Sequence, residues 1–145
     1  MALISDFGSS VKIAKYNVNP TAATAAATVE TNTDIYLPPL CIVLDVWIGV
    51  NVIDASATVD VGTTLVSNDP DGYLDAAALG VAGLVKGIMT DSAVTKGVLL
   101  TEDEDGSGAL VPLPDFASSS DRISFTTSSG CDTADFDIYV MYLEM

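Results

Sequence analysis

The sequence has no histidine, and its five lysines and arginines are outnumbered by twenty aspartates and glutamates, which gives a formal net charge of −15. Histidine is the side chain most used for proton transfer at neutral pH, so its absence excludes Ser–His and Cys–His nucleophilic catalysis. The acidic excess repels nucleic-acid phosphates and anionic lipid surfaces. We therefore expect no enzymatic activity, no cofactor, and no nucleic-acid or membrane partner.

Cysteine and long apolar runs are also scarce. The two cysteines, Cys41 and Cys131, are too few for a disulfide framework. We expect Cys41 to be a buried thiol, while Cys131 lies in a turn-like segment and a bridge between the two is an open alternative. The most apolar run, residues 40–53, is interrupted by polar residues and is too short to cross a bilayer. The first residues lack the basic start and apolar stretch of a signal peptide, which predicts synthesis in a cytoplasm.

Hydrophobic residues nevertheless make up 49% of the chain, enough for the core of one domain. Their main period is two, which is typical of strands that bury one face. This alternation predicts an all-β domain, a single β-sandwich or jelly roll over residues 21–145, preceded by an N-terminal arm over 1–20. The predicted strands cover residues 24–36, 40–53, 57–66, 96–101, 122–127 and 136–143.

Two of these strands carry further expectations. In 40–53, simple alternation places one uniformly apolar set on the core face: Ile42, Leu44, Val46, Ile48, Val50 and Val52. Trp47, on the other face, is expected in the core or at a subunit interface rather than against a sugar. The strand at 136–143 is apolar on both faces, so it is expected to be central in its sheet or packed against another subunit. That second possibility predicts self-association.

One segment departs from the strand pattern. After the turn at 68–72, the alanine-rich residues 73–80 predict a short helix, carried by a long loop and ended by Gly80. The same segment holds a candidate calcium site, because Asp69, Asp71 and Asp75 could gather carboxylate oxygens around an ion. The alternative is a plain turn, since a Pro-Asp-Gly sequence needs no ion to fold. We expect no strong dependence on calcium.

Other acidic residues have two interpretations each. The block at 102–105 is expected to be a solvated loop, and the alternative is a contact with a basic patch of a partner. Asp132, Asp135 and Asp137 cluster near the last strand, and paired carboxylates are the groups that a glycosidase uses. With a single tryptophan and few aromatic side chains in the sequence, we regard this hydrolase as the weaker hypothesis.

Residues outside obvious core positions are candidates for a protein–protein interface. Arg122, the sole arginine, either pairs with a neighbouring aspartate or anchors a subunit contact. The other candidates are apolar and lie in the N-terminal arm, in the 81–88 segment and on the second face of the last strand: Leu3, Ile4, Phe7, Leu84, Val85, Tyr139 and Met141. Such a contact would be mainly apolar, with the acidic loops tuning its rate.

Several segments, in order along the chain, resemble the cement or decoration proteins of tailed-bacteriophage capsids, which have a jelly-roll fold. These segments are 36–39, leading into 42–48, then 58–63, 69–75, 83–87 and 136–143. The resemblance implies a virion protein that binds the outer surface of the capsid shell, commonly as a homotrimer. It would bridge neighbouring major capsid subunits and stabilise the shell. The alternative is a carbohydrate- or receptor-binding module of a spike or fibre, because jelly rolls often serve as lectins.

Overall fold

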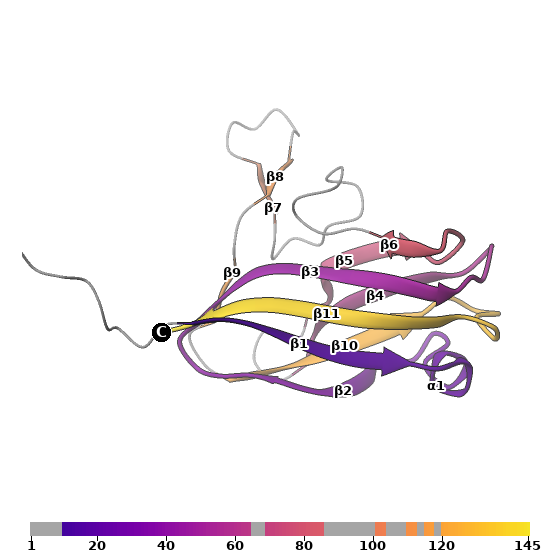
Figure 1. Cartoon of the computed structure of the whole chain (residues 1–145), viewed down its shortest axis with the longest axis horizontal. Helices are drawn as coiled ribbons and strands as arrows, with labels where there is room; N and C mark the ends of the chain where they lie inside the picture. The colour runs from indigo at the N-terminus through magenta and orange to yellow at the C-terminus, as the bar shows by residue number, and fades with distance from the viewer. Residues whose placement is uncertain (1–9, 65–68, 86–100, 104–109, 113–114, 118–119) are drawn as a thin grey trace, which may run out of the picture.

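A computed structural model of the chain describes residues 10–64, 69–85, 101–103, 110–112, 115–117 and 120–145 (Figure 1). Its strands are β1 (Ser10–Val18), β2 (Thr31–Leu37), β3 (Cys41–Val52), β4 (Thr58–Thr63), β5 (Asp69–Ala78), β6 (Gly83–Val85), β7 (Thr101–Asp103), β8 (Leu110–Pro112), β9 (Asp115–Ala117), β10 (Asp121–Thr127) and β11 (Asp135–Glu144). The helix in the described part of the chain is α1 (Pro20–Ala25). The predicted all-β class is confirmed.

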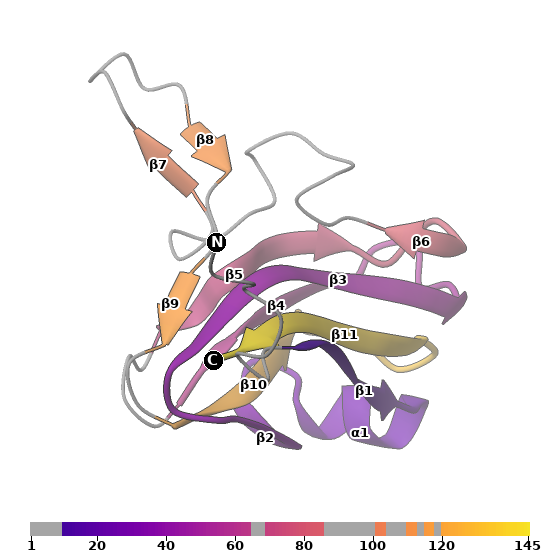
Figure 2. The ribbon, with the colours of Figure 1, turned by 60° about the vertical axis from the view of Figure 1, so that its left-hand side comes forward.

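Two antiparallel sheets face each other (Figure 2). Sheet A has the strand order β1-β11-β3-β6, with β9 also pairing β3, and sheet B has the order β2-β10-β4-β5. The short strands β7 and β8 form a separate pair. Because β11 lies between β1 and β3, the central position expected for the last strand is confirmed. No helix in the described ranges is long and apolar enough to cross a membrane.

The core lies between the sheets and takes alternate residues from each strand. Phe136 of β11 meets Phe125 of β10 edge-on at a ring-centroid distance of 6.4 Å, and both are fully buried. Tyr73 and Leu74 of β5, the edge strand of sheet B, belong to the same buried cluster. Burial of this apolar surface, worth about 25 cal/mol per Å² removed from water, holds the two sheets together.

The expected helix at 73–80 is wrong, because the segment forms most of β5. The residues Tyr73, Leu74, Ala77 and Leu79 are all buried, so packing against the core overrides the helix propensity of alanine. Ala76 takes a left-handed φ of 50° within this strand, where the pairing with β4 is irregular.

The helix instead forms at α1, inside the range expected to begin the first strand. The Asn19 side chain accepts a hydrogen bond from the Ala22 backbone N–H at 2.9 Å, and Pro20 occupies the first turn. An asparagine cap followed by proline is a start signal that was present in the sequence. The strand that was expected from residue 24 therefore begins at Thr31.

Residues 10–18 of the expected N-terminal arm form β1, which pairs with β11 over its whole length. Residues 1–9, which include Leu3, Ile4 and Phe7, lie outside the described residues. The predicted strand at 96–101 is described at Thr101 alone, where β7 begins.

The expected face assignment of β3 is wrong in its first half and again at its last residue, because Val52 exposes 50% of its surface beyond a second register shift. Met141 of β11 lies opposite Asp45, and Tyr142 lies opposite Val43, so Leu44 is an extra residue in β3. This bulge reverses the alternation. Cys41 and Val43 are therefore buried together with Val46, Ile48 and Val50, while Ile42 and Leu44 are partly exposed.

Candidate interaction surface

An aromatic stack lies on the outer face of sheet A. The register places Tyr139 of β11 between Lys15 of β1 and Trp47 of β3. The Trp47 and Tyr139 rings stack at 5.3 Å with an interplanar angle of 7°, and the Lys15 ammonium lies 5.5 Å from the Tyr139 ring centre. The expectation that Trp47 lies in the core is therefore wrong, whereas the interface alternative stays open.

Apolar side chains continue from this stack toward the start of β1. Ile13 is opposite Met141, and Val11 is opposite Leu143, which in turn is opposite Ile42. Val11 and Ile13 expose 58% and 59% of their surface. We call these five residues, Val11, Ile13, Ile42, Met141 and Leu143, the apolar strip. A contiguous patch of this kind on a folded domain is typical of a protein–protein contact.

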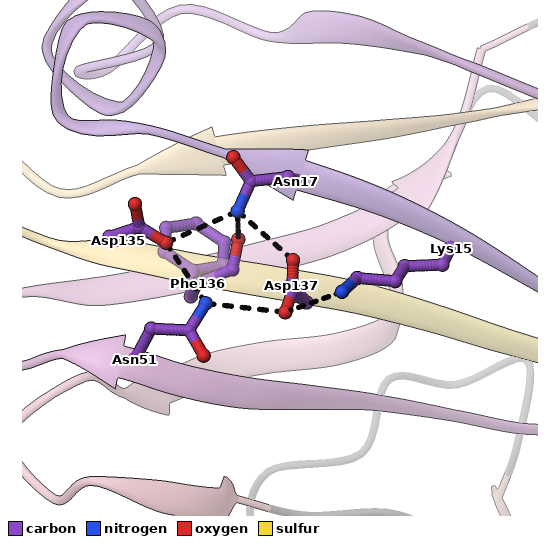
Figure 3. Close-up of polar contacts among 6 residues, drawn as sticks. All are labelled: Lys15, Asn17, Asn51, Asp135, Phe136 and Asp137. Carbon is purple, nitrogen blue, oxygen red and sulfur yellow. Dashed lines mark hydrogen bonds and ion pairs between the residues drawn. The ribbon is translucent and has the colours of Figure 1, made fainter.

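A cluster of carboxylates and amides lies at the other end of the same face (Figure 3). The Asn17 side-chain amide donates to Asp135 Oδ1 at 3.1 Å and to Asp137 Oδ1 at 3.0 Å. The Asn51 amide donates to Asp135 Oδ1 at 2.9 Å and to Asp137 Oδ2 at 3.2 Å. The Lys15 ammonium lies 3.0 Å from Asp137 Oδ2. These side-chain contacts link β1, β11 and β3, which are neighbours in sheet A.

The electrostatics of this cluster do not suit Asp137 to the role of the acid in a glycosidase. Burial acts to raise the pKa of Asp137, but the hydrogen bonds from Asn17, Lys15 and Asn51 outweigh it and lower the pKa below its usual value. A glycosidase acid needs a raised pKa so that it carries a proton at neutral pH. The same two amides also bridge Asp135 Oδ1 to the two carboxylate oxygens of Asp137. The hydrogen bonds of this cluster therefore stabilise the pairing of three neighbouring strands, β1, β11 and β3.

The outer face of sheet B is acidic. Asp34 of β2 and both Asp71 and Asp75 of β5 are exposed there. The Asp60 carboxylate of β4 accepts a hydrogen bond from the Ala76 backbone N–H at 2.8 Å. Burial, and then the charges of Asp75 and Asp71, raise the pKa of Asp60 above its usual value.

The three calcium candidates all lie on β5, and the pKa of Asp69 is raised by burial and by its neighbour Asp71. Within the described part of the chain, no three or more His, Cys, Asp or Glu side chains are grouped so that they could hold a metal ion. The structure therefore does not bring Asp69, Asp71 and Asp75 together as a ligand set.

The remaining candidates are distributed over several elements. The Arg122 Nε donates to the Thr33 carbonyl at 2.7 Å, and its guanidinium lies 4.9 Å from the Tyr36 ring centre, so this side chain ties β10 to β2. Leu84 and Val85 belong to β6 at the edge of sheet A, opposite Gly49 and Ile48. Cys41 and Cys131 are both buried and no disulfide joins them, so the alternative of a bridge between them is wrong.

Sequence reasoning found part of this surface. Tyr139 and Met141 are predicted as interface candidates, and Trp47 as a core or interface residue. The structure places them on the same face as Val11 and Ile13, which the sequence analysis does not name. The missing signal was the alternation of Val11 and Ile13 with polar neighbours in 10–18, which is typical of a strand.

Comparison with known proteins gives structural likenesses only. No family model matches the sequence, and no curated protein matches it. A chain in the cyanophage Pam1 capsid asymmetric unit has the same fold, with a TM-score of 0.58 and 15% identity over 100% of this chain and 92% of that chain. A chain in the acid-stable capsid structure of the Helicobacter pylori bacteriophage KHP30 is more distant, with a TM-score of 0.47 and 16% identity over 93% of this chain and 86% of that chain. At such identities the similarity to the Pam1 chain establishes a shared sandwich fold.

Proposed function

We propose that this protein is a structural component of a bacteriophage virion, which binds the outer surface of the capsid shell and bridges neighbouring major capsid subunits. The observation that carries the proposal is the fold shared over the whole chain with a chain of the Pam1 capsid asymmetric unit. The sequence resemblance to cement proteins supports it independently. Such a protein is made in the host cytoplasm and binds the shell as a homotrimer.

The outer face of sheet A is the proposed contact with the shell. Its apolar strip offers exposed β-branched side chains, and complete burial of one such side chain contributes about 1.5–3 kcal/mol. Within this face, Lys15 compensates the charge of Asp137. Contact through this face therefore buries apolar surface and leaves the acidic face of sheet B in solvent, where its charge influences the association rate more than the affinity.

In the alternative of a carbohydrate- or receptor-binding module, the ring of Tyr139 is not available to stack on a sugar. A sugar stacks on the free face of an aromatic ring. Tyr139 has Trp47 on one side and the Lys15 ammonium on the other, so both of its faces are covered.

Reconstitution on stripped capsids tests the proposal. Shell particles from which the protein has been removed are mixed with purified protein, and binding is measured by sedimentation and negative-stain imaging. Val11→Glu on the apolar strip is compared with Val29→Glu, a matched control, because each valine exposes 58% of its surface and Val29 lies outside sheet A.

We expect saturable binding of the natural protein, at least about tenfold weaker binding of Val11→Glu, and unchanged binding of Val29→Glu. Absence of binding by the natural protein would refute the proposed function. Equal binding of the two variants would refute the contact surface alone.

A further inference from the structure

The free edge of β1 differs from the other sheet edges of the sandwich. β1 pairs with β11 from Ser10–Glu144 to Val18–Phe136 without a register shift. The opposite edge of sheet A consists of the three-residue strands β6 and β9. In sheet B, the pairing of β2 with β10 shifts register once, and β5 contains Pro70 and the left-handed Ala76. Among the described strands, β1 is thus the long and regular edge.

Half of the backbone groups of β1 face away from the sheet. In an antiparallel pair, alternate residues direct their N–H and C=O groups to the partner, and the residues between them direct these groups outward. α1 and β2 lie close to β1 (Figure 2). The side chains of Ser10 to Ile13 are all exposed, so nothing in the described structure covers this end of the edge. An uncovered, regular edge is a template for one more strand.

The usual protection of such an edge is weakened here. Lysine on an edge strand opposes pairing because its charge must remain in water. The Lys12 ammonium forms an ion pair with Glu144, and the Lys15 ammonium forms one with Asp137, so both side chains extend across the sheet toward β11. Their charges are compensated within sheet A.

The net negative charge of the protein favours a positively charged partner strand at this edge. Two copies of this protein each carry a formal net charge of −15, so pairing β1 with the β1 of a second copy brings two strongly acidic domains together. The repulsion between them opposes this pairing. A segment with net positive charge is instead attracted by the field of the whole domain.

We propose that the free edge of β1 is a strand-addition site that binds an extended segment of a capsid shell protein, apolar at alternate positions and positively charged overall. This inference rests on the proposed function. The outward N–H and C=O groups of residues 10–15 supply main-chain hydrogen bonds. The apolar residues of the added strand extend the rows that Val11 and Ile13 begin with Leu143 and Met141.

Proline substitution at two consecutive positions tests the site. Proline lacks the backbone N–H, and consecutive residues of β1 donate in opposite directions. One of Lys12→Pro and Ile13→Pro therefore removes a donor to β11, and the other removes a donor of the free edge. Thermal unfolding identifies the two, because the variant that loses a bond to β11 is the less stable. Lys12→Ala and Ile13→Ala are the matched controls, since they remove the side chain and keep the N–H.

Binding to stripped shell particles is then measured for the free-edge proline variant and its alanine control, with amide hydrogen exchange of residues 10–15 in the natural protein. We expect the proline variant to bind at least about tenfold more weakly than the alanine control, and the exchange to slow on binding. Should both proline variants prove unstable, unchanged exchange on binding would by itself refute the site.

The other outcomes are equally distinct. If the natural protein binds shells and the free-edge proline variant binds as tightly as its alanine control, strand addition is refuted and the proposed function stands. If the natural protein does not bind shells, both fail. If the proline substitution abolishes self-association in analytical ultracentrifugation and leaves shell binding unchanged, the occupant is a second copy and the proposed partner is wrong.

Discussion

The outer face of sheet A and the outer face of sheet B belong to the same small domain, but their carboxylates have different surroundings. On sheet A, the amides of Asn17 and Asn51 donate hydrogen bonds to Asp135 and Asp137, Lys15 pairs with Asp137, and exposed apolar residues lie on the same face. On sheet B, Asp71 and Asp75 act on Asp60 by repulsion, and burial and this repulsion raise its pKa. Among the described residues, the two faces therefore differ in charge, with exposed apolar side chains on sheet A and exposed carboxylates on sheet B.

The largest effect in this comparison concerns one glycine on each sheet. A Cβ atom on Gly62 of β4 would lie 1.8 Å from the Asp69 carbonyl oxygen, whereas a Cβ on Gly49 of β3 would lie 3.4 Å from Tyr139 Cε2. Gly62→Ala must displace the backbone of β5, and we expect it to lower the free energy of unfolding by about 3 kcal/mol or more. Gly49→Ala makes an ordinary contact and should change it by less than about 1 kcal/mol. Urea unfolding of both variants measures the difference, and equal losses would contradict it.

A smaller effect is expected for the aromatic stack of sheet A. The coupling energy between Trp47 and Tyr139 follows from a double-mutant cycle with Trp47→Leu, Tyr139→Leu and the double variant. Stacked aromatic pairs contribute about 0.5–1.5 kcal/mol beyond the area that they bury, and we expect a coupling in this range. Additive losses would mean that the stack forms no specific contact.

These comparisons also show what the sequence could predict. Alternation alone located β10 and β11, because their apolar residues at every second position, such as Ile123 and Phe125 or Phe136 and Ile138, are buried in the core. It failed for β5, where alanine propensity favoured a helix and only contacts distant in the sequence override that preference. It also misplaced the first half of β3, since the extra residue Leu44 leaves no mark on hydrophobicity.

The candidate surface was predictable in part for the same reason. Tyr139 and Met141 were identified because their strand is apolar on both faces. Val11 and Ile13 become part of the surface through the pairing of β1 with β11, which joins the two ends of the chain. Such pairing depends on the global fold, and a local pattern does not encode its register.

The pH dependence of stability should have opposite signs on the two sheets. The folded-state pKa of Asp137 is lowered, so its charged form stabilises the folded protein. This stabilisation is fully present above the pKa of the unfolded chain and is lost as pH falls through the folded-state pKa. The folded-state pKa of Asp60 is raised, so its protonated form is the one that the folded state favours. The stability gained from it is fully present below the pKa of the unfolded chain and is lost as pH rises through the folded-state pKa.

Asparagine variants separate these contributions. At pH 7 we expect Asp137→Asn to be less stable than the natural protein, and Asp60→Asn to be equally or more stable, because its amide oxygen still accepts the Ala76 N–H. Both differences should shrink on acidification toward pH values below about 3.9, the ordinary aspartate pKa, as the carboxyl groups become protonated. Urea unfolding from pH 7 to pH 3 measures them. A loss at pH 7 as large for Asp60→Asn as for Asp137→Asn would remove the contrast between the faces.

The smallest effect is expected from calcium on the acidic face of sheet B. A calcium ion takes six to eight oxygen ligands at 2.3–2.6 Å, so a site needs several carboxylates that converge. Asp69, Asp71 and Asp75 follow an extended strand, and the described residues contain no group of three or more potential ligands. A ligand that binds the native state raises stability in proportion to the logarithm of its concentration above the dissociation constant. We therefore expect millimolar calcium to leave the melting temperature nearly unchanged in both the natural protein and Asp71→Ala. A large rise in the natural protein that Asp71→Ala abolishes would show that the acidic face is an ion site, and that sheet B compensates its charge with a metal as sheet A does with amides.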